Sequence, residues 1–128
     1  MTAAPVAIVT AAGRGIGAAC AHELAARGYR LALMSPSDRS VRLADELGGI
    51  GLQGSVTRPE DIDRLVQATM DAYGRIDAVV ANTGDPDRAD LLDLTDDQWL
   101  GALDLIFLNV VRMARAITPI MLAQGGGA

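Results

Sequence analysis

Short apolar runs alternate along this chain with longer segments in which apolar residues recur every three or four positions. The apolar runs are predicted strands, and they cover residues 6–10, 31–34, 51–56 and 76–81. The periodic segments are predicted helices, and they cover residues 16–27, 40–47, 57–74 and about 97–122. Because strands alternate with helices, we predict a parallel sheet with helices on both faces. The expected fold is a doubly wound, Rossmann-type α/β sheet in one domain, with about four strands and four helices.

Polar residues indicate where two of these helices begin. Thr57 is followed three residues later by Glu60, and Thr95 is followed in the same way by Gln98. This spacing is typical of a capping box, in which the two side chains and the first backbone N–H groups bond to each other. We therefore predict a capping box at the start of each of the last two helices.

The predicted last helix carries apolar residues on most of its circumference. One stripe consists of Leu103, Ile106, Val110, Ile117 and Met121. A second stripe consists of Phe107, Leu108, Val111 and Ala114. A helix that is apolar on most sides is buried on most sides. We expect one stripe to cover the sheet and the other to pack against another surface.

The turn between the first strand and the first helix is rich in glycine. Gly13, Gly15 and Gly17 lie there, although each glycine in regular structure costs roughly 0.5–1 kcal/mol relative to alanine. At this place in a doubly wound sheet, glycines let a pyrophosphate approach the free N–H groups of the helix. A tight turn without a ligand would show the same glycines. The position of this motif between the first strand and the first helix favours dinucleotide binding.

The composition argues against several classes of partner, namely nucleic acid, membranes and metal ions. The 128 residues carry a net charge of −5, which argues against a surface for nucleic acid or an anionic membrane. All eleven basic residues are arginine. Cys20 is the single cysteine, His22 has no neighbouring ligand, and no spacing fits a metal site. The start lacks a signal-peptide pattern and residues 100–122 include charges, so we expect a cytoplasmic protein without a membrane span.

Three blocks of the sequence resemble one enzyme family. They are TAAGRGIG at Thr10–Gly17, YGRIDAVVANTG at Tyr73–Gly84 and WLGALDLIFLNVVRMARAITPIML at Trp99–Leu122. In this order and spacing they resemble the cofactor turn, the fourth strand with its following motif, and the long fourth helix of the short-chain dehydrogenase/reductase family. The resemblance covers the whole chain but only the amino-terminal half of a usual member. It implies an NAD(P)-dependent oxidoreductase that moves a hydride between nicotinamide and a carbonyl or alcohol.

The resemblance also assigns residues to the cofactor. The residues that it places on the dinucleotide are Thr10, Gly13, Arg14, Gly15, Ile16, Gly17, Ser35, Ser55, Val56, Asn82, Thr83 and Gly84. Three positions depart from the family pattern. Alanine replaces a usual glycine at Ala11 and a usual asparagine at Ala81, and Ser55 replaces an aspartate that often contacts adenine.

A further departure concerns catalysis. The position of the family's catalytic asparagine falls at Ile106, which cannot organise a water molecule or a lysine. Asn109 lies about one helical turn further on, where it is either a substitute or a polar group at a packing surface. The chain therefore contains no residue that we assign to catalysis.

The end of the second strand bears on the choice of cofactor. Members that prefer NAD place an acid there to bind the ribose 2′-hydroxyl, whereas this chain has Ser35. Arg14 and Arg39 offer positive charge for a 2′-phosphate, so NADP is favoured. Pro36 stands where NADP-type members often carry arginine, and Asp38 offers an acid that favours NAD, so NAD stays possible.

The family's acid–base residues have no counterpart in this sequence. The serine and the Tyr-x-x-x-Lys pair are expected near and after Gly127, but the sequence contains no lysine and only Tyr29 and Tyr73. We therefore expect a domain that is truncated at its carboxyl end and is catalytically inactive alone. The sequence does not identify the substrate. The alternatives are a non-catalytic dinucleotide-binding or regulatory module complete at Ala128, and a non-functional remnant.

The resemblance finally implies a homo-oligomer that packs through the helix at 97–122. Without later strands to cover the fourth strand, and with its last helix exposed, the chain would lose on the order of 8–15 kcal/mol of burial. This loss is comparable to the whole stability of a domain. We therefore expect the isolated chain to be unstable, self-associated or aggregated.

Overall fold

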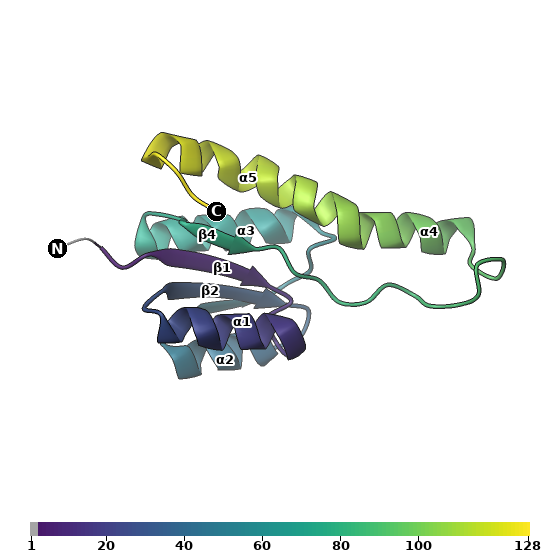
Figure 1. The fold of residues 1–128 in the computed structure, drawn as a ribbon, viewed down its shortest axis with the longest axis horizontal. Helices are drawn as coiled ribbons and strands as arrows, with labels where there is room; N and C mark the ends of the chain where they lie inside the picture. Colours follow the sequence, from purple (N-terminus) through teal and green to yellow (C-terminus); the bar gives the residue numbers. More distant parts are fainter. Residues whose placement is uncertain (1–2) are drawn as a thin grey trace.

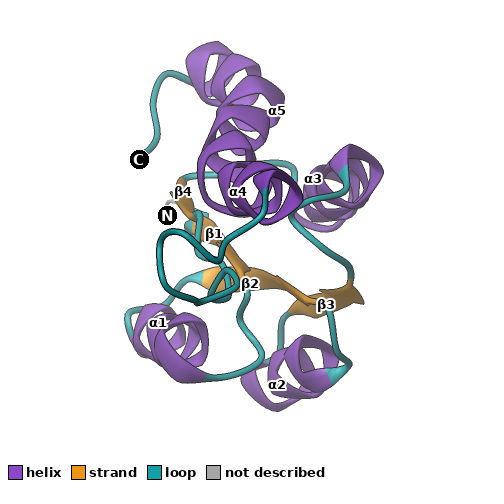
Figure 2. Ribbon diagram, turned by 90° about the vertical axis from the view of Figure 1, so that its right-hand side faces the viewer, coloured by secondary structure: helices purple, strands orange, loops and turns teal. Residues whose placement is uncertain are grey.

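A computed structural model describes residues 3–128 as a single sheet between two layers of helices (Figures 1 and 2). The strands are β1 (Val6–Thr10), β2 (Arg30–Ser35), β3 (Ile50–Gln53) and β4 (Ala78–Val80). The helices are α1 (Gly15–Ala26), α2 (Arg39–Leu47), α3 (Pro59–Tyr73), α4 (Asp96–Leu103) and α5 (Asn109–Gln124), with a π-helical turn, η1 (Asp104–Leu108), joining the last two. All strands are parallel and their order is β3-β2-β1-β4, which confirms the predicted doubly wound fold.

The two central strands form the buried middle of the molecule. Val6 pairs with Arg30 and Thr10 with Met34, so β1 and β2 run side by side over five positions. Every residue of β1 is buried, as expected for a parallel strand that is covered on both faces. The outer strands β3 and β4 are only partly buried, because each pairs with another strand on one side alone.

Helices cover both faces of the sheet (Figure 2). Helices α1 and α2 lie on one face, and α3 and α5 lie on the other (Figure 2). On the α3–α5 face, Ile8 and Met34 pack with Ile62, Leu65 and apolar residues of α5. The small residues of α1 allow that helix to approach β1 closely, and its fully covered positions are Gly17 and Ala21. The side chain of Ile16, at the start of the helix, is 75% exposed.

The outer edge of β4 pairs with the last residue of the chain. The Ala128 N–H donates to the carbonyl of Asp77 at 2.9 Å, and the Ala128 carbonyl accepts from the Val79 N–H at 2.9 Å. The Gln124 side chain fixes this return, because its amide donates to the Ile76 carbonyl at 2.6 Å and accepts from the Ile76 N–H. The yellow end of the ribbon accordingly turns back toward β4 in Figure 1.

The long last helix is interrupted by the π turn, which changes the residues that face the sheet. A π turn contains one residue more than an α turn, so the helix face rotates at this point. Leu105, Asn109, Met113 and Ile117 face inward, whereas Ile106 is 47% exposed. The predicted stripe from Leu103 to Met121 is therefore wrong in its first half, and its second half, at Ile117 and Met121, packs against the core.

Of the two predicted capping boxes, one is confirmed and the other is wrong. Thr95 and Gln98 form the reciprocal bonds at the start of α4. Helix α3 begins instead after Arg58, whose side chain makes no capping bond. The hydroxyl of Thr57 bonds to Ser55 rather than to the helix start.

By length and composition, the segment Asp96–Gln124 is the one helix of residues 3–128 that could cross a membrane. Arg112 and Asp104 form an ion pair inside this segment, which is costly in a lipid core. The same apolar length fits a helix that packs against protein on more than one side.

Candidate dinucleotide-binding site

The candidate site lies at the carboxyl edge of the sheet, where the parallel strands end. The chain leaves β1 toward β2 on one side, and β4 flanks β1 on the other, so the strand order reverses between β1 and β4. Ligands of open α/β sheets bind in the crevice at such a reversal. The glycine turn follows β1 at this point, and the Asn82–Gly84 segment follows β4.

The buried Thr10 side chain and the half-buried Asn82 join the ends of β1 and β4. The Thr10 hydroxyl donates to the Asn82 carbonyl at 2.6 Å and accepts from the Asn82 N–H at 3.0 Å. The Asn82 side-chain amide donates to the Ala11 carbonyl at 3.4 Å. Thr10 and Asn82 therefore hold the floor of the site together.

The turn after β1 has the backbone conformation that glycines favour. Ala11 has φ +49° and is the one non-glycine residue with positive φ among residues 3–128. By the resemblance stated above, this position is usually glycine. Gly15 has φ +55°, and a Cβ there would point into open space. At Gly17 a Cβ would lie 2.2 Å from the Ala11 carbonyl oxygen, so no side chain fits. The turn thus keeps the amino end of α1 bare and packs the helix closely on β1.

A pocket of about 440 Å³ opens between this turn and the end of β2. Its lining residues are Ala11, Gly13, Arg14, Ser35, Pro36, Ser37, Arg39 and Gly84. Gly13 makes room for the second wall, because a Cβ there would lie 2.9 Å from Arg39 Cβ and 3.0 Å from Ser35 Oγ. Three chain segments that are distant in sequence therefore meet around one cavity.

The pocket has a cationic character although the chain is acidic overall. Arg14 and Arg39 line it, and neither forms an ion pair with any residue in the described part of the chain. The carboxyl edge also presents the amino end of α1, which attracts anions. The arrangement is suited to a ligand that carries several phosphate groups.

The loop after β3 uses its polar groups internally. The Ser55 hydroxyl bonds to Thr57, and the Ser55 N–H donates to Asp61 Oδ2 at 2.9 Å. This backbone bond and the Arg64 guanidinium lower the pKa of the Asp61 carboxyl. The Val56 carbonyl accepts from Arg112 at 3.4 Å. Ser55 and Val56 therefore lie outside the pocket wall, and the Ser55 hydroxyl is already engaged.

The residues considered for catalysis lie in or beside the π turn. Ile106 is exposed, whereas Asn109 is 1% exposed. Neither the oxygen nor the nitrogen of the Asn109 amide has a hydrogen-bond partner among residues 3–128, and the same holds for the buried Thr83 hydroxyl. Buried polar groups without partners are rare in native proteins. Thr83 and Asn109 are not among the residues that line the pocket, although Thr83 directly precedes Gly84, which does line it.

Of the residues predicted to bind a dinucleotide, the structure places Gly13, Arg14, Ser35 and Gly84 around the pocket. Thr10 and Asn82 lie beneath it, and Gly15, Ile16 and Gly17 form the start of α1. Sequence reasoning did not assign a binding role to Ala11, Pro36 or Ser37, which also line the cavity. The sequence signal that could have identified them is that they are near Gly13 or Ser35 in the chain.

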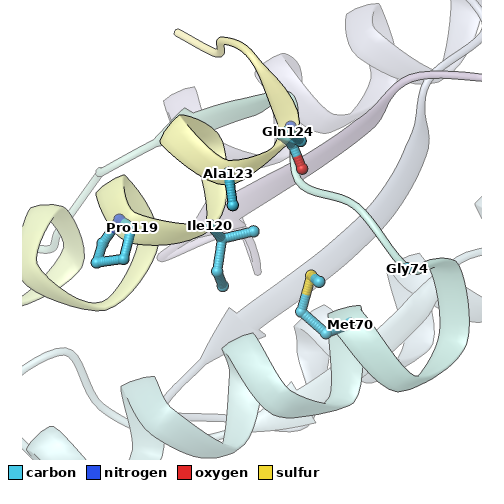
Figure 3. Close-up of a pocket in the computed structure, with 6 residues that line it drawn as sticks. All are labelled: Met70, Gly74, Pro119, Ile120, Ala123 and Gln124. Carbon is cyan, nitrogen blue, oxygen red and sulfur yellow. The ribbon is translucent and has the colours of Figure 1, made fainter.

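A second hollow lies at the opposite edge of the sheet, between α3 and α5 (Figure 3). Met70, Ile120 and Ala123 point into it, and its volume is about 430 Å³. The C-terminal ends of helices line this groove, and these ends do not favour anions. The groove therefore does not compete with the carboxyl edge as a phosphate site.

Comparisons with known proteins agree with this geometry. Residues 5–128 match the family described as short chain dehydrogenase. A 3-oxoacyl-[acyl-carrier-protein] reductase of Synechocystis sp. is 35% identical over 97% of this chain and 53% of its own length. A reductase of the same description from Escherichia coli is 31% identical over 95% of this chain and 51% of its own length.

Two solved structures share the fold at similar coverage. L-sorbose reductase from Gluconobacter frateurii, complexed with NADPH and L-sorbose, has a TM-score of 0.87 and 27% identity over 98% of this chain and 50% of its own. A short chain dehydrogenase/reductase from Burkholderia phymatum, in complex with NAD, has a TM-score of 0.89 and 27% identity over 94% of this chain and 45% of its own. This chain therefore spans about half the length of the relatives it matches. Because the family match covers nearly the whole sequence and the glycine turn lies at the strand reversal, the chain belongs to the short chain dehydrogenase family.

Proposed function

We propose that this chain is the cofactor-binding half of an NAD(P)-dependent oxidoreductase that acts on a carbonyl or alcohol. The observation that carries the proposal is the cavity at the strand reversal, bounded by a bare helix start and two arginines without ion-pair partners among the described residues. The nicotinamide cofactor would supply the hydride. The residues of this chain would bind and orient the cofactor.

Each wall of the cavity suits a different part of a dinucleotide. The open space at Gly15 and the amino end of α1 fit the pyrophosphate. Thr10 and Asn82 hold the floor beneath it. Gly84 closes the side that faces β4. We assign Ser55 and Val56 to the adenine side through their backbone atoms, since the Ser55 hydroxyl is engaged with Thr57.

NADP is the favoured cofactor. Ser35 ends β2 without a carboxylate, and its hydroxyl faces the Gly13 turn. Arg14 and Arg39 line the same cavity, and guanidinium groups bind phosphate well. A 2′-phosphate would place additional negative charge between them. NAD lacks this charge, so it should bind less tightly.

The acid–base step needs residues that this chain does not bring to the site. The sequence contains no lysine, and its two tyrosines lie at the amino edge of the sheet. The Tyr73 hydroxyl donates there to the Leu31 carbonyl at 3.3 Å. We therefore propose that the 128 residues bind cofactor without turnover, and that the acid and base belong to a second half like that of the relatives.

One observation favours a non-catalytic dinucleotide-binding module instead. The family's asparagine position is an exposed isoleucine, Ile106. Both alternatives predict cofactor binding, so binding does not distinguish them. The intact mass of the native product distinguishes them, because only a product longer than these 128 residues can contain a Tyr-x-x-x-Lys pair, and an oxidoreductase should have a mass near twice 13.3 kDa. We place the protein in the cytoplasm, as a homo-oligomer that packs through α4 and α5.

Calorimetric titration of the chain with NADP⁺ and NAD⁺ tests the binding proposal. Gly15→Ala would place a methyl group in the open space meant for the pyrophosphate, and affinity should fall about tenfold or more, which is about 1.4 kcal/mol. Gly28→Ala is the matched control, because Gly28 also has positive φ and open surroundings but follows α1 at its other end. No detectable binding of either dinucleotide to the folded wild-type chain would refute the proposal. Equal losses in both variants would refute the role of Gly15.

A further inference from the structure

An acidic side chain stands beside the cavity without lining it. Asp38 lies between Ser37 and Arg39, both of which contribute to the cavity wall. Its carboxylate is bonded to Arg42, one helical turn further along α2, with Arg42 Nη2 2.8 Å from Asp38 Oδ1. This acid beside the cationic wall is therefore paired with Arg42, and neither Asp38 nor Arg42 lines the cavity.

The backbone around Asp38 is fixed, so its side chain alone decides where the charge lies. The Ser35 hydroxyl donates to the Ser37 carbonyl at 2.9 Å and accepts from the Ser40 N–H at 3.2 Å. These bonds tie the turn to the start of α2 on both sides of Asp38. Asp38 is the N-cap residue of α2, yet its carboxylate makes no capping bond. Arg42 is thus the group that holds it.

The location of this charge has opposite consequences for the two cofactors. A carboxylate that faces the end of β2 accepts hydrogen bonds from the ribose hydroxyls of NAD. The same carboxylate repels a 2′-phosphate, which is an anion. The Arg42 guanidinium lowers the pKa of Asp38, so the group is charged at neutral pH. Bonded to Arg42, the carboxylate forms no ion pair with Arg14 or Arg39, and both guanidinium groups remain available to a phosphate.

We propose that Arg42 is a specificity-determining residue, because it holds Asp38 away from the cavity and so preserves the preference for NADP over NAD. This inference rests on the proposed dinucleotide site. Arg42 acts through Asp38 and is a positioning residue, not a ligand of the cofactor. Both side chains are more than 60% exposed, and exposed pairs at this spacing are weak. The effect should therefore be a modest change in preference.

A double-mutant cycle on the full chain tests the proposal. The dissociation constants for NADP⁺ and NAD⁺ are measured by calorimetry for the wild type, Arg42→Gln, Asp38→Asn and the double variant. Arg42→Gln should lower the NADP⁺ preference about two- to fivefold, partly through tighter binding of NAD⁺. Asp38→Asn should keep the preference or raise it. The double variant should match Asp38→Asn, because Arg42 has no effect once the carboxylate is gone.

Arg27→Gln provides the control, since Arg27 pairs with Glu23 at the same spacing, at 2.7 Å and with similar exposure, on α1. It should leave the preference unchanged. An unchanged preference in Arg42→Gln would overturn the proposal. If the double variant loses as much NADP⁺ preference as Arg42→Gln, the proposal is also overturned, because Arg42 then acts directly on the cofactor. If the folded wild type binds neither dinucleotide, the proposed function itself fails.

Discussion

The outer face of the last helix should drive self-association, and Phe107 is the residue to change. We define the apolar ridge as Leu100, Leu103, Phe107 and Val110, which recur every three or four residues and are 63%, 54%, 61% and 50% exposed. Soluble monomers rarely expose a continuous apolar surface of this kind. Phe107→Asp places a charge in the middle of the ridge.

The expected effect follows from the exposed fraction. Full burial of a phenylalanine is worth about 1.5–3 kcal/mol, so covering the remaining three-fifths of Phe107 is worth about 1–2 kcal/mol. A twofold interface contains the residue twice, which makes about 2–4 kcal/mol. The dimer dissociation constant should therefore rise about thirty- to several-hundredfold in Phe107→Asp. The desolvation of the new carboxylate adds to this loss.

Sedimentation velocity over a wide range of concentrations measures the effect. The wild type should form dimers or larger assemblies, and Phe107→Asp should shift toward monomer. Leu92→Asp is the control, because Leu92 is 94% exposed but lies in the loop before α4, away from the ridge. A wild type that stays monomeric with a sharp cooperative melt would refute the reasoning. An equal effect of the two substitutions would show that charge alone matters, not the ridge.

Two further predictions concern the stability of the folded chain. Gly17→Ala should destabilise it by about 3 kcal/mol or more, because the new Cβ would lie 2.2 Å from the Ala11 carbonyl oxygen and neither backbone segment can yield cheaply. Thermal unfolding measures this, and a loss below about 1 kcal/mol would show that the turn adapts. Asp61 has a lowered pKa in the folded state, so its contribution is present above the ordinary value of 3.8 and is lost as pH falls through the lower folded value. Asp61→Asn should therefore lower the free energy of unfolding at neutral pH and make it fall less steeply in acid. Urea unfolding of the wild type and the variant between neutral and acidic pH measures this. If Asp61 contributes nothing, the free energies of the two proteins will follow parallel curves against pH.

The strands and helices were predictable because burial imposes a strong pattern on them. The strand β1 has the predicted bounds, since all its residues are buried and Ala11, which follows it, has a positive φ. The strand β3 ends at Gln53, three residues before the predicted end, because Gly54 and Ser55 begin the loop that Asp61 holds. Such a loop depends on a hydrogen bond across six residues, which periodicity does not detect.

The glycine turn was predictable for a different reason. Its glycines are required by backbone geometry and by lack of space, and they form a motif within a few residues. A Cβ at Gly17 would meet the Ala11 carbonyl of the same turn, whereas the lack of space at Gly13 comes from Ser35 and Arg39, which are distant in sequence. The pairing of Asp38 with Arg42 was not predicted, although the spacing of four residues on a helix was available as a signal.

The π turn accounts for the main error and for the unusual position of Asn109. A straight helix would direct Ile106 toward the sheet and leave position 105 outside, as the predicted stripe assumed. The additional residue in the π turn reverses this, so Leu105 packs on the core and Asn109 becomes buried one turn later. An apolar residue thus stands on the exposed side, where the family uses a polar one, and a polar residue lies buried without a partner among the described residues. The π turn therefore explains both why Ile106 faces outward and why the Asn109 amide lies in the packing surface of the helix.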